Sequence, residues 1–183
     1  MGNVRLYGST SGYTELAPPA VAPDGVLSLP SGVGTLLTAE GGKVLQVVRA
    51  TNATDQTTTS NSYTDVTGMS ITITPQKNTS NIIILSAFHV NASNTNTLSR
   101  VSLYQLTDSA NTALSGAQGY DIGLLNGTPY SMYTPVTLVG YASPATTSAV
   151  TYKLRFKVNA TPASTTIFNS IVTGQLYAIE VSA

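Results

Sequence analysis

The sequence predicts an all-β protein, a two-sheet sandwich of the jelly-roll type behind an extended N-terminal arm. Three observations support this fold class. Hydroxyl and amide side chains dominate the polar residues, with 28 Thr, 20 Ser and 12 Asn among 183 residues. Several short stretches alternate apolar and polar residues with the period of two that a half-buried strand requires. Proline and glycine are concentrated in the first 42 residues, where they disfavour regular structure.

The composition excludes several classes of protein. Charged residues make up only 9% of the chain, against about 25% in an ordinary soluble domain. Eight basic and eight acidic residues give zero net charge, which argues against a general nucleic-acid binder. The absence of cysteine excludes disulfides and thiolate metal sites. No apolar run is long enough for a membrane span or a signal peptide, so we expect neither.

Residues 1–42 have two interpretations. The first is a flexible leader, since chain termini are often loose. The second is an extended arm that becomes ordered against a partner, and the apolar residues between the prolines favour it, because a pure linker would be rich in Gly and Ser. The expected partner-binding residues of the arm are Tyr7, Tyr13, Leu16, Val26, Leu27, Leu29, Leu36 and Leu37.

From residue 43 to residue 183 the pattern predicts one head domain of seven or eight strands. The predicted strands cover residues 44–49, 69–74, 81–91, 101–106, 133–141, 150–158 and 175–181. The clearest alternation is in 150–158, where the apolar side chains occupy every second position. Loops are expected at 57–62 and 93–97, and no amphipathic helix longer than a turn or two is expected. Such a series is typical of a two-sheet sandwich, of which the jelly roll is one form.

An unbroken apolar run lies within the predicted strand 81–91. A strand without a polar face is usually covered on both sides. One face of this strand can pack inside the sandwich, but no helix is available to cover the other, so a subunit interface is the expected cover. The candidate interface residues are Ile82, Ile83, Ile84 and Leu85.

A basic row lies on one face of the predicted strand 150–158. Lys153, Arg155 and Lys157 alternate with apolar residues, which places them about 7 Å apart on the same side. One interpretation is a solvated face, paired with Glu180 of a neighbouring strand. The other is an electrostatic patch for an acidic partner surface, or a polar layer in a subunit interface.

Enzymatic chemistry finds little support. His89 is the single histidine and lies in a predicted strand, while a zinc site needs three or four ligands. A Ser-His-Asp arrangement is formally possible from Ser86 or Ser102 with His89 and Asp65 or Asp108, but no nucleophile-elbow motif supports it. The acidic residues are scattered singly, whereas a glycosidase needs a carboxylate pair. We therefore expect no catalytic residues, no metal and no cofactor.

Two stretches carry a family resemblance. Residues 8–22 (GSTSGYTELAPPAVA), followed by 26–30 (VLSLP), resemble a segment of tailed-phage virion proteins, especially those of marine and cyanobacterial phages. Residues 62–75 (SYTDVTGMSITITP), then 80–84 (SNIII), are similar to a jelly-roll virion module that often ends like 176–181 (LYAIEV). The family usually has lysine at the position of Asn81. The resemblance covers the arm and most strands of the head.

The resemblance implies a homotrimer of heads with the fold of tumour necrosis factor. It also implies a phage structural protein. Since no signal peptide is expected from the sequence, we expect this protein to be made in the host cytoplasm. The economy of one arm and one head favours a capsid cement (decoration) protein on the outer capsid surface, with the major capsid protein as partner. The alternative is a short tail-fibre or receptor-binding protein that contacts host surface glycans. A glycan-cleaving depolymerase is a third, weaker hypothesis, because no carboxylate pair is evident.

Overall fold

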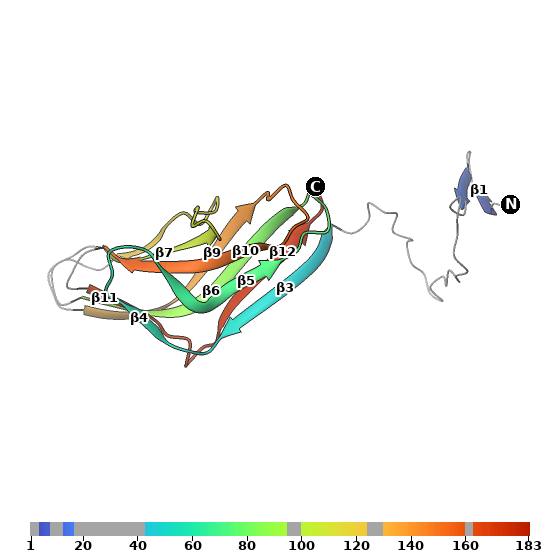
Figure 1. Cartoon of the computed structure of the whole chain (residues 1–183). Coiled ribbons are helices and arrows are strands. Elements are labelled where there is room, and N and C mark those ends of the chain that lie inside the picture. Colours follow the sequence, from blue (N-terminus) through green and yellow to red (C-terminus); the bar gives the residue numbers. More distant parts are fainter. Residues whose placement is uncertain (1–3, 8–12, 17–42, 95–99, 124–129, 160–162) are drawn as a thin grey trace. The chain divides into compact units, whose positions relative to one another are not determined.

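The computed structural model describes residues 4–7, 13–16, 43–94, 100–123, 130–159 and 163–183 (Figure 1). The chain divides into two compact units, residues 1–37 and 38–183. The first contains an antiparallel hairpin of β1 (Val4–Tyr7) and β2 (Tyr13–Leu16). This hairpin was not predicted from the sequence, and it ends before the first proline. The side chains of the candidate arm residues lie outside the described part of the chain.

The described residues of the second unit form ten strands and no helix. These are β3 (Val44–Asn52), β4 (Gln56–Thr58), β5 (Thr64–Ile73), β6 (Asn81–Asn94), β7 (Arg100–Asp108), β8 (Tyr120–Gly123), β9 (Tyr130–Ala142), β10 (Val150–Val158), β11 (Ala163–Ile167) and β12 (Gly174–Val181). All seven predicted strands are present. The short β4, β8 and β11 were missed, and β4 falls at the start of the loop predicted at 57–62.

The strand pairing is that of a jelly roll. When β4 and β11 are set aside, eight strands remain, and the first pairs with the last, the second with the seventh, the third with the sixth and the fourth with the fifth. These pairs are β3 with β12, β5 with β10, β6 with β9, and β7 with β8, all antiparallel. This nesting is what results when one long hairpin folds over on itself, so the predicted fold class is confirmed.

The eight strands form two sheets, seen as two layers in Figure 1. One sheet has the order β5-β10-β7-β8, and we call it the front sheet. In the other, the back sheet, β6 is central and pairs with β9 along one edge from Ile82 to Asn94. Its second edge is shared, because β12 pairs with residues 81–87 and β11 with residues 90–94.

The core lies between the two sheets. The predicted alternation of β10 is confirmed, since Tyr152, Leu154, Phe156 and Val158 are buried while the intervening residues are not. On the facing sheet the inward residues of β12 and β6 are equally buried. The rings of Phe88 and Tyr104 pack across the core with centroids 5.3 Å apart. The phenol of Tyr104 also hydrogen-bonds the Thr165 hydroxyl of the opposite sheet, so a polar contact joins the layers inside the core.

Candidate functional site

A bulge in β5 shapes the charged region of the front sheet. Lys153 of β10 pairs with Ser70 of β5, but Arg155, two residues on, pairs with Asp65. Four residues of β5, 66–69, therefore lie opposite the single residue Leu154 of β10, and they include Gly68, whose φ of +77° favours glycine. The bulge turns β5 so that the Asp65 side chain faces both Lys153 and Arg155.

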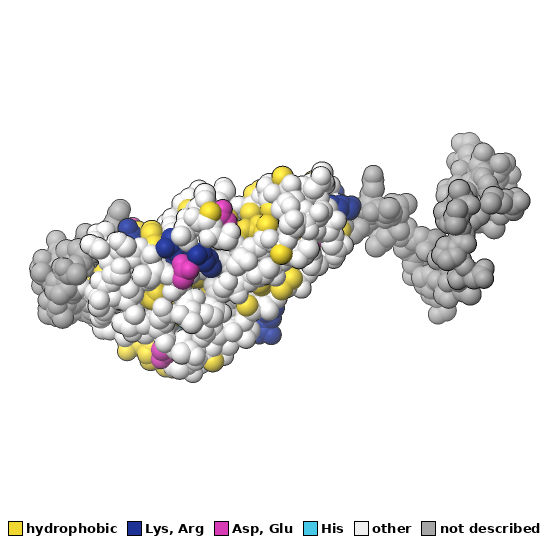
Figure 2. Space-filling model, in the orientation of Figure 1, with side chains coloured by type: hydrophobic (Ala, Val, Ile, Leu, Met, Phe, Trp, Pro, Cys, Tyr) yellow, Lys and Arg dark blue, Asp and Glu magenta, His cyan; other side chains and the backbone are white. Residues whose placement is uncertain are grey.

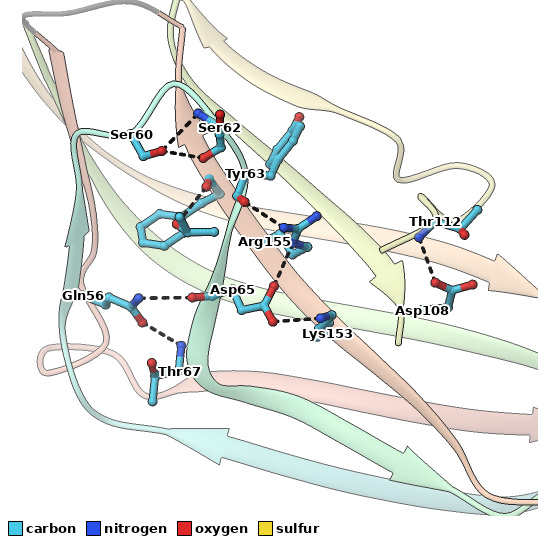
Figure 3. A network of polar contacts seen from close by, with 12 residues as sticks. Gln56, Ser60, Ser62, Tyr63, Asp65, Thr67, Asp108, Thr112, Lys153 and Arg155 are labelled. Carbon is cyan, nitrogen blue, oxygen red and sulfur yellow. Dashed lines mark hydrogen bonds and ion pairs between the residues drawn. The ribbon is translucent and has the colours of Figure 1, made fainter. Parts of the chain in front are cut away.

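The side-chain amide of Gln56 in β4 holds this bulge from the other side (Figure 3). Its Nε2 donates to the carbonyl of Asp65 at 3.2 Å, and its Oε1 accepts from the backbone amide of Thr67 at 2.6 Å. The Gln56 amide group thus provides hydrogen-bond partners for one backbone C=O and one backbone N–H that the bulge removes from the pairing between strands. The position of Asp65 is fixed by β4, β5 and β10 together.

Two members of the basic row, Lys153 and Arg155, contact this carboxylate (Figure 3). Lys153 Nζ lies 2.8 Å from Asp65 Oδ2, and Arg155 Nε lies 2.7 Å from Asp65 Oδ1. The Lys153 and Arg155 side chains are each 16% exposed, against 51% for Asp65. The hydrogen bond from Lys153, aided by Arg155, lowers the pKa of Asp65 below its usual value against the opposing effect of burial.

The row continues onto Tyr63. Arg155 Nη2 donates to the Tyr63 carbonyl at 2.7 Å, and Lys157 Nζ lies 4.8 Å from the centroid of the Tyr63 ring, a cation–π contact. Burial raises the pKa of the Tyr63 phenol, with Arg155 acting in the opposite direction. Figure 2 shows a small cluster of basic and acidic side chains on a face that is otherwise mostly uncharged.

The expected pairing of this row with Glu180 is wrong. Glu180 lies on β12 of the back sheet and is fully buried. Its carboxylate accepts from Gln46 Nε2 at 2.6 Å and from the backbone amides of Gln76 and Lys77 at 2.8 and 3.3 Å. The carboxylate therefore secures the turn between β5 and β6. The acidic partner of the basic row is Asp65 instead. It was not predicted because Gly68 within a strand pattern is the only sequence signal of the bulge that places Asp65 there.

The back sheet carries the second candidate surface, an apolar sheet face on its outer side. In register, Ile83 of β6 lies between Ile179 of β12 and Tyr141 of β9, and Ile179 lies beside Val47 of β3. A second row places Leu85 between Tyr177 and Val139. The apolar sheet face consists of Val47, Ile83, Leu85, Val139, Tyr141, Tyr177 and Ile179.

Several of these side chains are open to solvent. Val47, Val139 and Tyr141 are 56%, 51% and 47% exposed. With strands about 4.8 Å apart, a row of four spans roughly 15 Å of sheet surface. Contiguous exposed apolar surface of this kind is typical of an interaction site.

The predicted interface run is divided between the two sides of β6. Ile82 and Ile84 are fully buried in the core, whereas Ile83 and Leu85 belong to the apolar sheet face. The prediction that Ile82 and Ile84 lie in a subunit interface is therefore corrected. Both point into the core, because successive strand residues point to opposite faces. The other members of the face were missed, although apolar neighbours such as Val47 and Val48 signal strands without a polar side.

An aromatic group lies further along the same side of the back sheet. The Tyr133 side chain is 57% exposed, and its ring stacks with His89 at 6.5 Å and meets Phe168 edge-on at 5.8 Å. A groove of about 180 Å³ adjoins His89 and is also lined by Phe88, Pro135, Thr137 and Val172.

His89 is not brought together with the serines and aspartates of the formal catalytic arrangement. Ser86 and Ser102 are buried on inward positions, while His89 lies on the outer side of β6. Asp65 belongs to the front sheet. Within the described ranges, no three or more His, Cys, Asp or Glu side chains are grouped so as to hold a metal ion. No helix of the described chain is long and apolar enough to cross a membrane.

Comparison with known proteins gives few relations. No family model and no curated protein matches the chain. Solved structures of the Gx and Gt strains of infectious bursal disease virus are similar over 96% and 97% of this chain, at 15% and 17% identity and TM-scores of 0.31 and 0.28. A mutant VP2 protein of that virus, in derived T=1 particles, is 18% identical over 97% of this chain, with a TM-score of 0.24.

This chain spans 46%, 46% and 44% of the length of those three chains. With identities and TM-scores this low, the fold assignment stands on the strand pairing alone.

Proposed function

We propose that this protein is a non-enzymatic structural protein of a phage virion, a capsid cement protein that binds the outside of the shell as a homotrimer. The observation that carries the proposal is the apolar sheet face. It combines with the resemblance of the arm and head to tailed-phage virion proteins. The major capsid protein is the proposed partner of the assembled heads and arms.

A second copy is the cover that best suits this face. One row across the sheet runs from Val47 through Ile179 and Ile83 to Tyr141. Each large apolar side chain contributes roughly 1.5–3 kcal/mol when it is fully buried. A closed ring of identical heads leaves no copy with this face uncovered, whereas an open row leaves it exposed at one end. With 9% charged residues, the chain has little charge repulsion to oppose such association.

The variant Ile83→Asp tests the assembly. It places a charge between Ile179 and Tyr141, at the centre of the face, where burial against another subunit would leave it without a partner. We expect wild-type protein to run as a trimer in size-exclusion chromatography with light scattering, and Ile83→Asp as a folded monomer.

The control variant is Thr72→Asp, which adds the same charge at an exposed position of β5 in the front sheet. It is expected to remain a trimer, and circular dichroism checks that both variants fold. A wild-type monomer at micromolar concentration, or an Ile83→Asp trimer, would contradict the proposed assembly.

One observation favours the alternative of a short tail-fibre protein that contacts host glycans. The exposed ring of Tyr133 and the adjoining groove combine an aromatic face with the polar groups of His89 and Thr137, a combination that suits a small polar ligand. The copy number per particle separates the two functions. Hundreds of copies support a cement protein, whereas a few dozen or fewer support a fibre.

A further inference from the structure

We propose that a cleft at one end of the sandwich binds an aliphatic ammonium group through the carboxylate of Asp108. The cleft has a volume of about 290 Å³ and shares no lining residue with the basic row or the apolar sheet face. The inference goes beyond the proposed function, since it requires neither a second copy nor a capsid.

Three segments form the walls of this cleft: the end of β7 with the loop that follows it, the end of β9, and the start of β10. The loop after β7 is tied to both sheets. The backbone amide of Leu114 in the loop donates to the Leu106 carbonyl of the front sheet at 2.9 Å. The Tyr141 amide of the back sheet donates to the Ser115 carbonyl of the loop at 3.0 Å. The walls are therefore fixed without a ligand, as is usual for small-ligand sites.

Asp108 places its carboxylate on the inner side of the front sheet. In register it lies opposite Tyr152, which is buried in the core, and residues directly opposite one another share a face. Asp108 Oδ1 accepts from the backbone amide of Thr112 at 2.8 Å (Figure 3). Among the described residues the carboxylate forms no ion pair. A partly buried charge of this kind gains from a cationic partner.

The polar groups of the cleft favour a ligand that donates hydrogen bonds and carries positive charge. Asp108 is the only charged residue that lines the cleft. Burial, together with the charge of Asp108, raises the pKa of the Tyr152 phenol to about 12, so the phenol is neutral at pH 7. The Ser143 hydroxyl donates to Asn81 Oδ1 at 2.6 Å, which leaves its oxygen free to accept. An ammonium group has three donors and no acceptor, and it suits a carboxylate beside a hydroxyl oxygen.

The rest of the cleft suits an aliphatic chain. Leu114, Pro144 and Val150 contribute apolar lining. The methylene stem of a lysine lies along apolar surface of this kind while its charged end reaches a polar partner. The volume is at the low end of the range for small-ligand pockets, about 300–1,000 Å³, so the ligand is a short amine. A free diamine and the side chain of a protein lysine both carry this group.

Nuclear magnetic resonance titration of the ¹⁵N-labelled full-length chain with 1,5-diaminopentane tests the proposal. We expect saturable shifts of the amide resonances of Ser109, Thr112 and Tyr152, which lie in or beside the cleft. The neutral analogue 1,5-pentanediol is expected to bind about tenfold more weakly, because it cannot form the charge-assisted hydrogen bond to Asp108. Diamine binding is also expected to weaken from 0.1 M to 1 M salt, as the screening length falls from about 10 Å to about 3 Å.

Three variants give the test its controls. Asp108→Asn removes the charge and keeps an oxygen for the Thr112 amide, and it is expected to weaken diamine binding about tenfold. Asp121→Asn changes the net charge equally at an exposed position of β8 and is expected to leave binding unchanged. Ala142→Leu fills the cleft from β9 without changing any charge and is expected to block binding, which keeps the test decisive if Asp108→Asn does not fold.

A parallel titration with Nα-acetyl-lysine N-methylamide distinguishes the two sources of the ammonium group. Tighter binding of this derivative assigns the cleft to a protein lysine, and tighter binding of the diamine assigns it to free amines. Equal responses to the diamine and the diol, or diamine binding that both Asp108→Asn and Ala142→Leu leave unchanged, overturn the proposal. Light scattering should give Asp108→Asn the same mass as the wild type, so a failure of this site is distinguishable from a failure of the proposed trimer.

Discussion

At the scale of single residues, Glu180 shows how one carboxylate stabilises a turn. Burial alone would raise the pKa of Glu180, but the hydrogen bonds from Gln46 and from the backbone amides of Gln76 and Lys77 outweigh it. The pKa therefore lies below its usual value. The folded state needs the carboxylate ionised, since these three donors point at its two oxygens.

We expect stability to depend on pH through this group. A carboxyl whose folded pKa is depressed contributes stability above its unfolded pKa of about 4.3, and that contribution is lost as pH falls through the folded pKa. Urea unfolding at pH 7 and at pH values below about 4 should show the loss. Asp65, whose pKa is also lowered, contributes in the same direction.

The variant Glu180→Gln isolates the effect. In this variant an amide NH₂ group replaces one of the two carboxylate oxygens that accept hydrogen bonds. The free energy of unfolding at pH 7 should therefore fall by about 1–3 kcal/mol. The variant should lose less stability on acidification than the wild type. An identical acid-induced loss in both proteins would show that Glu180 is not the group responsible.

At the scale of elements, the bulge of β5 determines which side chains meet. Gly68 has a φ of +77°, and an added Cβ would clash with Asn52 Nδ2. Gly68→Ala therefore forces a strained backbone and displaces Asn52. We expect a loss of about 1–3 kcal/mol in thermal unfolding, the range for a residue held in an unfavourable conformation.

The matched control is Gly119→Ala, because an added Cβ there meets its nearest atom, Tyr63 Oη, at 3.8 Å and the φ is not positive. It should leave stability nearly unchanged. Equal effects of the two substitutions would contradict the interpretation of the bulge.

At the scale of the whole molecule, the head is expected to fold without the arm. The backbone amide of Ser182 donates to the Lys43 carbonyl at 2.7 Å, and β3 pairs with β12 from Val44 onward. A chain that begins at Lys43 keeps every strand pair of the two sheets. We expect it to retain the far-ultraviolet circular dichroism of a β-protein and a cooperative unfolding transition.

The same truncated chain tests the arm. Under the proposed function it should fail to bind phage particles that lack the protein, whereas the full chain binds them in a sedimentation assay. Binding by the truncated head as tight as that of the full chain would contradict the role of the arm. The basic row of Lys153, Arg155 and Lys157 would then be the better candidate for the capsid contact.

The sequence by itself determined the fold class and the long strands, because a period of two and turn-forming residues are local properties of the chain. The sequence also determined which side chains of β10 share a face, since Tyr152 and Phe156 are an even number of residues apart. It missed β4, β8 and β11, which have three to five residues each, too few to display a period.

Only the tertiary structure decided which residues share a surface. The apolar sheet face gathers Val47, Ile83, Tyr141 and Ile179 from four strands that are far apart in sequence, and their register is set by antiparallel pairing. Likewise, Asp65 meets Lys153 because a bulge shifts β5 against β10, while Glu180 is buried in the other sheet. Local patterns determine which way a side chain points on its own strand, but partners across strands depend on long-range pairing, which no local pattern contains.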